Sequence, residues 1–426
     1  MRLMLSATAA LTLLALPAPA LAAGALGSWH PVGETAAEHN GHSATLLYDG
    51  TVLVVGGQAF NSATPGGVEI FNPAQGTWTT AAPTAVARSR HAAIRLDDGR
   101  VLVIGGNRLA PDQPSLPVAS AELFDPVAGS WSPAASMASA RLQPTATLLG
   151  DGRVLVAGGG ADAESATASA EIYDPATDRW TRAAPMTTPR IEASALLLRT
   201  GEVLVAGGAS SAANQDGSFD TAELYDPRTD RWRPTPKMAA AHAGADSAVL
   251  GDGNVLLAGG LDYQGGYGIA VQATDLYNPA HNTWSSGPPL LVARGQAGGA
   301  LLGNGSFLVV GGTSRSNARS ESTAELLDPL AQRWTLLPLL PETRIGATVT
   351  AVPGDRALVV GGSRRQAAEL FAPPARAAPG GSPALSSAIA DNRPLLALTV
   401  LLLLGVAIQA GWKRRLGPSS RIRRAK

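Results

Sequence analysis

Residues 145–180, TATLLGDGRVLVAGGGADAESATASAEIYDPATDRW, contain the pattern that decides the fold. An apolar run ends at Asp151-Gly152, and a second run ends at Gly158-Gly159. An Asp-Gly pair between two apolar runs predicts a tight β-hairpin, because glycine tolerates positive φ.

The second half of the same segment predicts another hairpin. After a variable loop come Glu171, two apolar residues and an Asp-Pro pair, and Trp180 follows nine residues after the acid. The whole unit therefore predicts four short strands. We name them A (before the Asp-Gly turn), B (ending in Gly-Gly), C (beginning at the acid) and D (beginning at the tryptophan).

This unit recurs along the chain at intervals of 49 to 53 residues. The glycine pairs are Gly56-Gly57, Gly105-Gly106, Gly158-Gly159, Gly207-Gly208, Gly259-Gly260, Gly311-Gly312 and Gly361-Gly362. The acids that begin strand C are Glu69, Glu122, Glu171, Glu223, Asp275, Glu325 and Glu369. The tryptophans nine residues after the first six acids are Trp78, Trp131, Trp180, Trp232, Trp284 and Trp334. Four-stranded units of this period are typical of β-propeller blades.

The seventh unit has no tryptophan after Glu369, and Trp29 lies before the first unit. Every strand-D tryptophan, Trp29 included, stands 27 residues before the next glycine pair. We therefore predict that an N-terminal strand D at Trp29 completes the seventh blade and closes the ring. Such closure removes a free sheet edge.

The repeat resembles the kelch family over roughly residues 28–373, through its glycine pairs, the aromatic residue on strand C and the spaced tryptophan. The resemblance implies an all-β, seven-bladed kelch-type propeller. It also implies a likeness to the central domain of galactose oxidase, a copper radical enzyme that needs a thioether-linked Cys–Tyr pair. The chain has no cysteine, so this chemistry is excluded, and disulfides and thiolate ligands are excluded with it.

Both ends of the chain predict membrane targeting. Residues 1–22 read as a signal peptide, with Arg2, an apolar run and Ala20-Leu21-Ala22 before the cleavage point; an uncleaved N-terminal anchor is the alternative. Residues 23–373 are the expected propeller. Residues 374–394 are a linker rich in Pro, Ala, Gly and Ser, which is expected to act as a stalk.

Residues 395–412 are uncharged and just long enough to form a transmembrane helix. The tail, residues 413–426, is basic, which predicts a cytoplasmic C-terminus and a propeller outside the membrane. A sorting signal that is later removed is the alternative interpretation. Only three lysines occur, at Lys237, Lys413 and Lys426, which suggests a GC-rich bacterial genome and a periplasmic location; a Gram-positive or a eukaryotic cell surface is the alternative.

The charge balance gives no reason to expect nucleic-acid binding. The formal net charge is +0, but seven basic residues lie in the tail, so acids outnumber bases in the central region.

Loop lengths indicate which face of the propeller binds. The D–A and C–D connections keep a constant length, whereas the step from Gly-Gly to the acid varies from 7 to 16 residues. Variable loops on a rigid scaffold are a usual binding surface, and unconstrained drift is the alternative. The B–C loops carry the aromatic residues Phe60, Phe219, Tyr263 and Tyr267, which either stack on a ligand or fold back over the blades.

A base stands 17 residues before each glycine pair. These bases are His39, Arg88, Arg141, Arg190, His242, Arg294 and Arg344. One hypothesis places them around the channel mouth as a site for an anion or an acidic sugar. The competing and favoured hypothesis pairs each base with the repeated acid as part of the architecture.

We therefore expect a membrane-anchored binding or scaffold protein that recognises a glycan or an envelope protein through the B–C loop face. The alternative is a sugar-active enzyme, because the chain is also similar to the kelch-type sialic-acid mutarotase, a periplasmic propeller with charged residues at its channel mouth. No nucleophile elbow, P-loop or dinucleotide fingerprint is present. His39 and His42 lack an evident third ligand, so neither a metal nor a cofactor is expected.

Overall fold

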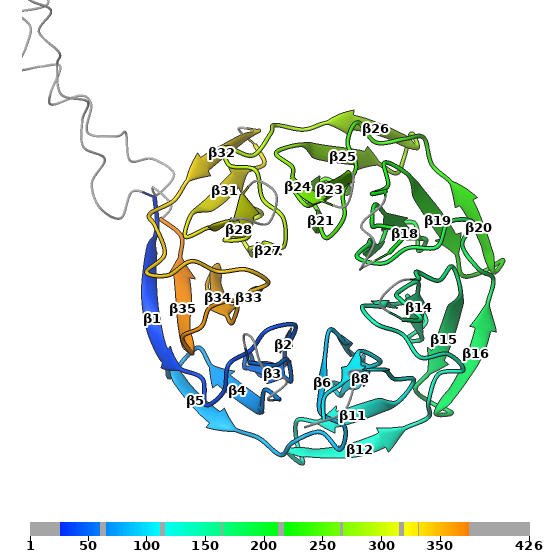
Figure 1. Ribbon diagram of the computed structural model, residues 1–426, viewed down its shortest axis with the longest axis horizontal. Helices are drawn as coiled ribbons and strands as arrows, with labels where there is room; N and C mark the ends of the chain where they lie inside the picture. Colours follow the sequence, from blue (N-terminus) through cyan, green and yellow to red (C-terminus); the bar gives the residue numbers. More distant parts are fainter. Residues whose placement is uncertain are drawn as a thin grey trace, which may run out of the picture. The chain divides into compact units, whose positions relative to one another are not determined.

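A computed structural model describes residues 26–59, 65–110, 116–162, 165–211, 217–264, 267–314, 319–330 and 332–374. Within these ranges all regular elements are β-strands, which confirms the prediction of an all-β fold. Figure 1 shows the sheets arranged radially around a central channel, with strand A of each sheet innermost and strand D outermost.

The described strands form seven four-stranded antiparallel sheets, which correspond to the repeated sequence units. In chain order, the first four sheets are β2 (Ser43–Leu46), β3 (Val52–Val55), β4 (Val68–Asn72), β5 (Thr77–Thr80); β7 (Ala92–Arg95), β8 (Val101–Ile104), β11 (Ala121–Asp125), β12 (Ser130–Ala134); β13 (Thr145–Leu148), β14 (Val154–Ala157), β15 (Ala170–Asp174), β16 (Arg179–Ala183); and β17 (Ser194–Leu197), β18 (Val203–Ala206), β19 (Ala222–Asp226), β20 (Arg231–Pro234). The remaining three are β21 (Asp246–Val249), β22 (Val255–Ala258), β25 (Thr274–Asn278), β26 (Thr283–Ser286); β27 (Gly298–Leu301), β28 (Phe307–Val310), β31 (Ala324–Asp328), β32 (Arg333–Leu336); and β33 (Thr348–Val352), β34 (Arg356–Val360), β35 (Ala367–Ala372), β1 (Ser28–Glu34). We refer to them as blades 1 to 7.

Short additional strands lie in the connections at one face of the ring. They are β6 (Arg88–Ser89), β9 (Asn107–Arg108), β10 (Leu116–Pro117), β23 (Leu261–Gln264), β24 (Tyr267–Ala270), β29 (Thr313–Ser314) and β30 (Arg319–Ser320). The pair β23–β24 is a hairpin in the B–C loop of blade 5.

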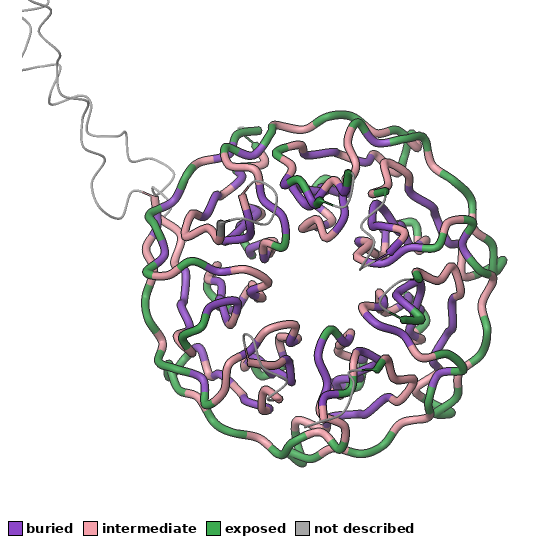
Figure 2. The backbone as a smooth tube through the Cα atoms, viewed as in Figure 1, coloured by how far each residue is buried: buried purple, intermediate pink, exposed green. Residues whose placement is uncertain are grey.

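The hydrophobic core consists of a layer between each pair of neighbouring blades. Strand B is buried along its whole length in blades 1 to 6, as its unbroken apolar sequence predicts. Between blades 7 and 1, for example, Val52, Val54 and Phe71 pack against Leu358 and Val360. Figure 2 shows buried segments inside the blades and exposed segments along the outer strands.

The glycine pairs lie where neighbouring blades approach each other so closely that a side chain would not fit. Gly158 and Gly159 both have positive φ, and a Cβ atom on Gly158 would lie 2.5 Å from the Arg190 carbonyl oxygen of the next blade. The Gly159 N–H donates a 2.8 Å hydrogen bond to that same carbonyl. The closing contact is equivalent, since the Gly362 N–H donates to the His39 carbonyl at 3.1 Å.

The strand-D tryptophans join the blades on the outer side. Trp180 stacks on Tyr173 of its own blade, with ring centroids 5.0 Å apart, and its indole N–H donates to the Ala135 carbonyl of the preceding blade at 2.7 Å. Trp29 does the same in blade 7, where it packs on Phe371 and donates to the Pro338 carbonyl at 2.8 Å.

Ring closure by the N-terminal strand is confirmed. Strand β1 pairs antiparallel with β35, so that Trp29 lies opposite Phe371. The last described strand of the chain thereby acquires the strand D that its own sequence lacks.

The two predicted targeting segments lie outside the described residues. They are the signal peptide of residues 1–22 and the C-terminal region of residues 375–426, which includes nearly all of the linker, the apolar segment 395–412 and the basic tail. Among the residues that the structure does describe, none forms a helix with the length and apolarity needed to cross a bilayer.

Candidate functional site at the mouth of the central channel

The D–A connections and the B–C loops meet at one face of the propeller, as the alternation of strand direction predicts. Isolated β-bridges join them, for example Leu142 with Gly160 in blade 3 and Ile191 with Ala209 in blade 4. We call this the mouth face, and the A–B and C–D turns form the opposite face.

The seven repeated bases are buried clamps within this face. Each is at most 2% exposed. Each donates a side-chain hydrogen bond of 2.7 to 3.0 Å to the carbonyl of the first glycine in its blade, in the pairs His39–Gly56, Arg88–Gly105, Arg141–Gly158, Arg190–Gly207, His242–Gly259, Arg294–Gly311 and Arg344–Gly361.

Six of the seven bases also contact the repeated acid of their blade. The separations are 2.7 to 3.3 Å in the pairs His39–Glu69, Arg88–Glu122, Arg141–Glu171, Arg190–Glu223, His242–Asp275 and Arg294–Glu325. In blade 7 the pair is not formed: Arg344 donates instead to the Ala367 carbonyl, and Glu369 Oε2 is buried without a hydrogen-bond partner. Burial accordingly raises the pKa of Glu369.

The acids also explain why the D–A connection has constant length. Glu223, for example, accepts hydrogen bonds from the backbone N–H groups of Thr187 and Thr188 at 2.7 and 3.1 Å. One carboxylate thus holds both the connection and the clamp base, and an inserted residue would break this geometry.

The prediction of a ring of bases accessible at the channel mouth is therefore corrected. Their guanidinium and imidazole groups are used inside each blade, and burial lowers the pKa of Arg88 and Arg141 against the opposing effect of their acids. The structure favours the architectural interpretation of all seven.

A different set of residues surrounds the channel mouth, and the sequence analysis missed it. Two positions after each clamp base, the chain turns through a left-handed conformation. The rim residues at these turns are Gly41, Arg90, Gln143, Glu192, Gly244, Gln296 and Gly346, with φ between 49° and 68°. The same counting reveals them, since each stands 15 residues before its glycine pair.

Four of the rim residues have polar side chains in a conformation that favours glycine. Arg90, Gln143, Glu192 and Gln296 have φ of 49° to 57°, a strain of about 1 kcal/mol or more for each residue. The structure shows glycine at the three other rim positions, so the sevenfold pattern is broken here and kept in the clamps. Retained strain of this kind is typical of functional sites.

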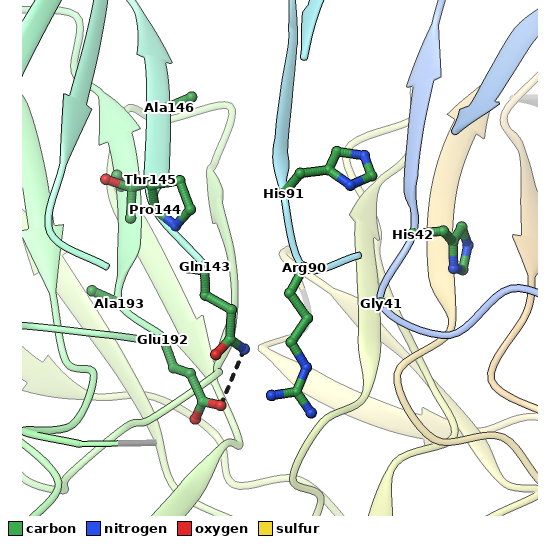
Figure 3. Close-up of a pocket in the computed structure, with 11 residues that line it drawn as sticks. Gly41, His42, Arg90, His91, Gln143, Pro144, Thr145, Ala146, Glu192 and Ala193 are labelled. Carbon is green, nitrogen blue, oxygen red and sulfur yellow. Dashed lines mark hydrogen bonds between the residues drawn. The ribbon is translucent and has the colours of Figure 1, made fainter. Parts of the chain in front are cut away.

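Arg90, Gln143 and Glu192 line a pocket of about 390 Å³ in the channel. Its wall comprises Gly41, His42, Arg90, His91, Gln143, Pro144, Thr145, Ala146, Glu192, Ala193 and Ala195. Figure 3 shows the polar ends of Arg90, Gln143 and Glu192 at the same end of this pocket, with His42 and His91 at the other. A second cavity of about 280 Å³ adjoins it and includes the rim residues of the remaining blades.

Glu192 orients two of its neighbours. Its Oε1 accepts a 3.3 Å hydrogen bond from the Gln143 amide N–H, and its Oε2 accepts a 3.1 Å bond from the Tyr263 hydroxyl. Tyr263 comes from the β23–β24 hairpin of blade 5, and burial together with the Glu192 charge raises its pKa. The network thus connects a B–C loop to the rim.

Several polar groups of the pocket lining have no protein partner, among them Nδ1 of His42 and Nδ1 of His91 at one end of the pocket. Gln143 Oε1 is buried without a hydrogen bond. The Arg90 side chain is exposed at the rim, and its guanidinium makes neither an ion pair nor a hydrogen bond with any of the described residues. At its rim end the pocket therefore offers a ligand one cation, at Arg90, and one buried acceptor, at Gln143, beside the Glu192 carboxylate.

The loop aromatics fall into different environments. Phe219 packs on the clamp, with the Arg190 guanidinium carbon 5.1 Å from its ring centroid, and Tyr263 is 5% exposed. Tyr267 is 70% exposed on β24, beside Ile269 at 44%. Phe60 lies outside the described residues.

Comparisons with known proteins agree with this architecture. The model of the Kelch motif matches residues 143–187 and 200–239. Human Kelch-like protein 34 is 35% identical over 147 residues, which cover 33% of this chain and 21% of that protein. Galactose oxidase of Gibberella zeae is 32% identical over 88 residues, covering 21% and 12%. Each alignment thus spans less than half of the relative's own length.

A solved structure extends the likeness to most of the ring. A fungal alcohol oxidase of the AA5 family, in complex with copper, superposes with a TM-score of 0.68 over 84% of this chain and 79% of its own, at 20% identity. The chain is a kelch-repeat β-propeller.

The relatives that match this kelch propeller include a Kelch-like protein of Mus musculus, 29% identical over 125 residues. The fungal alcohol oxidase shares the propeller fold, and this sequence contains no cysteine.

Proposed function

We propose that this kelch propeller is an envelope-anchored binding module, whose seven blades lie outside the cytoplasmic membrane and recognise a glycan or an envelope protein through the mouth face. The observation that carries the proposal is the broken symmetry of the rim. Seven clamps repeat, whereas Arg90, Gln143, Glu192 and Gln296 are distinct side chains around one pocket.

The surface around the pocket supports a partner larger than the pocket itself. Tyr267 and Ile269 expose apolar area on the β23–β24 hairpin, at the same face. Aromatic and aliphatic side chains of this kind anchor protein interfaces and stack on sugar rings.

The last described strand ends on the face opposite the mouth face. Strand β35 runs from the mouth face to the opposite face, where Phe371 pairs with Ala357 just after the A–B turn of blade 7.

Site-specific photo-crosslinking in cells tests the proposal. A photoreactive residue replaces Tyr267 on the mouth face or, as the matched control, Val127, which is 98% exposed in the C–D turn of the opposite face. We expect adducts from position 267 alone, in the membrane fraction, with the propeller accessible to protease from outside the cell. Equal adducts at both positions, or a propeller protected inside the cell, would contradict the proposal.

The second candidate, a sugar-active enzyme, now rests on the rim rather than on the clamp bases. Arg90, Glu192 and Tyr263 place a cation, a carboxylate and a hydroxyl in one region. Turnover of a reducing sugar that is lost in both Arg90→Gln and Glu192→Gln would favour this function over binding alone.

A further inference from the structure

The partner-free groups of the pocket define a ligand more narrowly than the mouth face as a whole. The rim turns that carry Arg90 and Gln143 are hydrogen-bonded to each other, since the Gln143 backbone N–H donates to the Arg90 carbonyl at 2.9 Å. Their side chains therefore reach neighbouring points of one bound molecule.

The orientation of the Gln143 amide is determined by Glu192. Because the amide nitrogen donates to Glu192 Oε1, the amide oxygen faces away from that carboxylate and is buried without a donor. An unsatisfied buried acceptor is costly, and a ligand that brings an O–H or N–H group removes the cost.

The positive charge of the site comes from Arg90, and the Glu192 carboxylate lies at the same end of the pocket. Both oxygens of Glu192 already accept hydrogen bonds, from Gln143 and from Tyr263, whereas the Arg90 guanidinium has no acceptor among the described residues. A planar guanidinium with free donors matches a carboxylate in a bidentate contact.

The remaining walls limit the ligand to a compact, polar molecule. Pro144, Ala146, Ala193 and Ala195 are small, and none of the described residues that line the pocket of about 390 Å³ is Phe, Tyr or Trp. This volume suits a small metabolite or the end of a longer chain.

We propose that the channel mouth binds a carboxylate whose α-carbon carries a hydroxyl or amide donor, with Arg90 on the carboxylate and Gln143 Oε1 accepting from the α-donor. Glu192 and Tyr263 are positioning residues for Gln143. This inference rests on the mouth face being the binding face, and it names the chemistry recognised there. Such a group occurs in hydroxy acids, including sugar acids, and at the C-terminus of a peptide.

Three acids with one carbon skeleton test the proposal, namely propionate, lactate and N-acetylalanine. They differ only in the α-substituent, which is hydrogen, hydroxyl or acetamido. Binding to the full-length chain in a mild detergent is measured by ligand-detected saturation-transfer NMR, with titration for affinity. We expect lactate or N-acetylalanine to bind at least about fivefold more tightly than propionate. The tighter of the two identifies the source as a hydroxy acid or a peptide end.

Two variants separate the two contacts. Arg90→Gln should weaken all three acids about tenfold. Gln143→Gly, which the glycines of other rim positions show to be compatible with the turn, should remove the preference over propionate and leave propionate affinity unchanged. Arg100→Gln, on the opposite face where Arg100 pairs with Asp98, is the matched control and should change nothing.

The proposal is overturned if no acid binds, if all three bind the wild type equally, or if Arg90→Gln binds them as the wild type does. In those cases crosslinking from position 267 still reports on the mouth face, so a failure of the ligand assignment is distinguishable from a failure of the proposed function.

Discussion

Arg88 and Arg90 are two residues apart and have opposite roles. Arg88 is fully buried, donates to Gly105 and Glu122, and has a counterpart at the same position in every blade. Arg90 is exposed at the rim in a left-handed turn, where three of the other blades have glycine. Regular repetition thus marks what holds the blades together, and irregularity on the same repeat marks the candidate site.

Ring closure is the broadest test of the architectural half of this comparison. Deleting residues 24–35 removes β1 and Trp29, leaves the edge of β35 unpaired, and is expected to lower the free energy of unfolding by about 5 kcal/mol or more. Thermal melting of the purified chain measures the loss, and a synthetic peptide of residues 24–35 should restore part of it. A truncated chain that melts like the full chain would show that closure adds no stability.

The clamp layer should be nearly as sensitive. Arg88→Gln leaves Glu122 without its cation and removes the guanidinium that donates to the Gly105 carbonyl, so we expect a loss of about 3 to 5 kcal/mol in denaturant unfolding. Exposed Arg153→Gln, which breaks only a surface pair with Asp151, is the control and should cost less than about 1 kcal/mol. Equal losses for the two variants would remove the distinction between clamp and surface.

The histidines beneath the rim predict acid sensitivity. His91 hydrogen-bonds Ser43 of the preceding blade, its Nδ1 has no partner, and burial, assisted by Arg88, lowers its pKa to about 3. The unfolded chain takes up this proton near pH 6.5 and the folded chain does not. Stability from this group is therefore present above pH 6.5 and lost as the pH falls toward 3.

The variant that checks this is His91→Ala, since Ala193 and Ala245 occupy the same position in other blades. Between pH 6.5 and 4.5, the wild type should lose about 2 to 3 kcal/mol more than the variant in denaturant unfolding. Asp246 acts in the opposite direction, because burial raises its pKa to about 7, so it is kept unchanged in both proteins. Parallel pH profiles would assign the acid sensitivity to other groups.

Substitutions at the rim should change the stability of the protein least. Arg90→Gly removes an exposed side chain and relieves a left-handed turn, so the free energy of unfolding should change by less than about 1 kcal/mol. The same variant should lose carboxylate binding. A large loss of stability would instead make Arg90 a structural residue and end the comparison with Arg88.

The sequence by itself determined the repeat, the four-stranded unit and the closing role of Trp29. The glycine pairs, acids and tryptophans recur at fixed spacing because each makes the same short-range contact in each blade. The sequence also predicted that the clamp bases and the acids lie on the same face, although it left open whether a ligand or the acid was their partner.

Only the tertiary structure decided between those partners and revealed the pocket. A left-handed turn separates Arg88, which faces a carboxylate, from Arg90, which faces the channel beside residues of blades 3 and 4. Tyr263 contacts Glu192 although the two residues are 71 positions apart in the chain. Spacing along one chain records contacts that repeat within a blade. Contacts that form only once, between blades around the shared channel, cannot be predicted from this spacing.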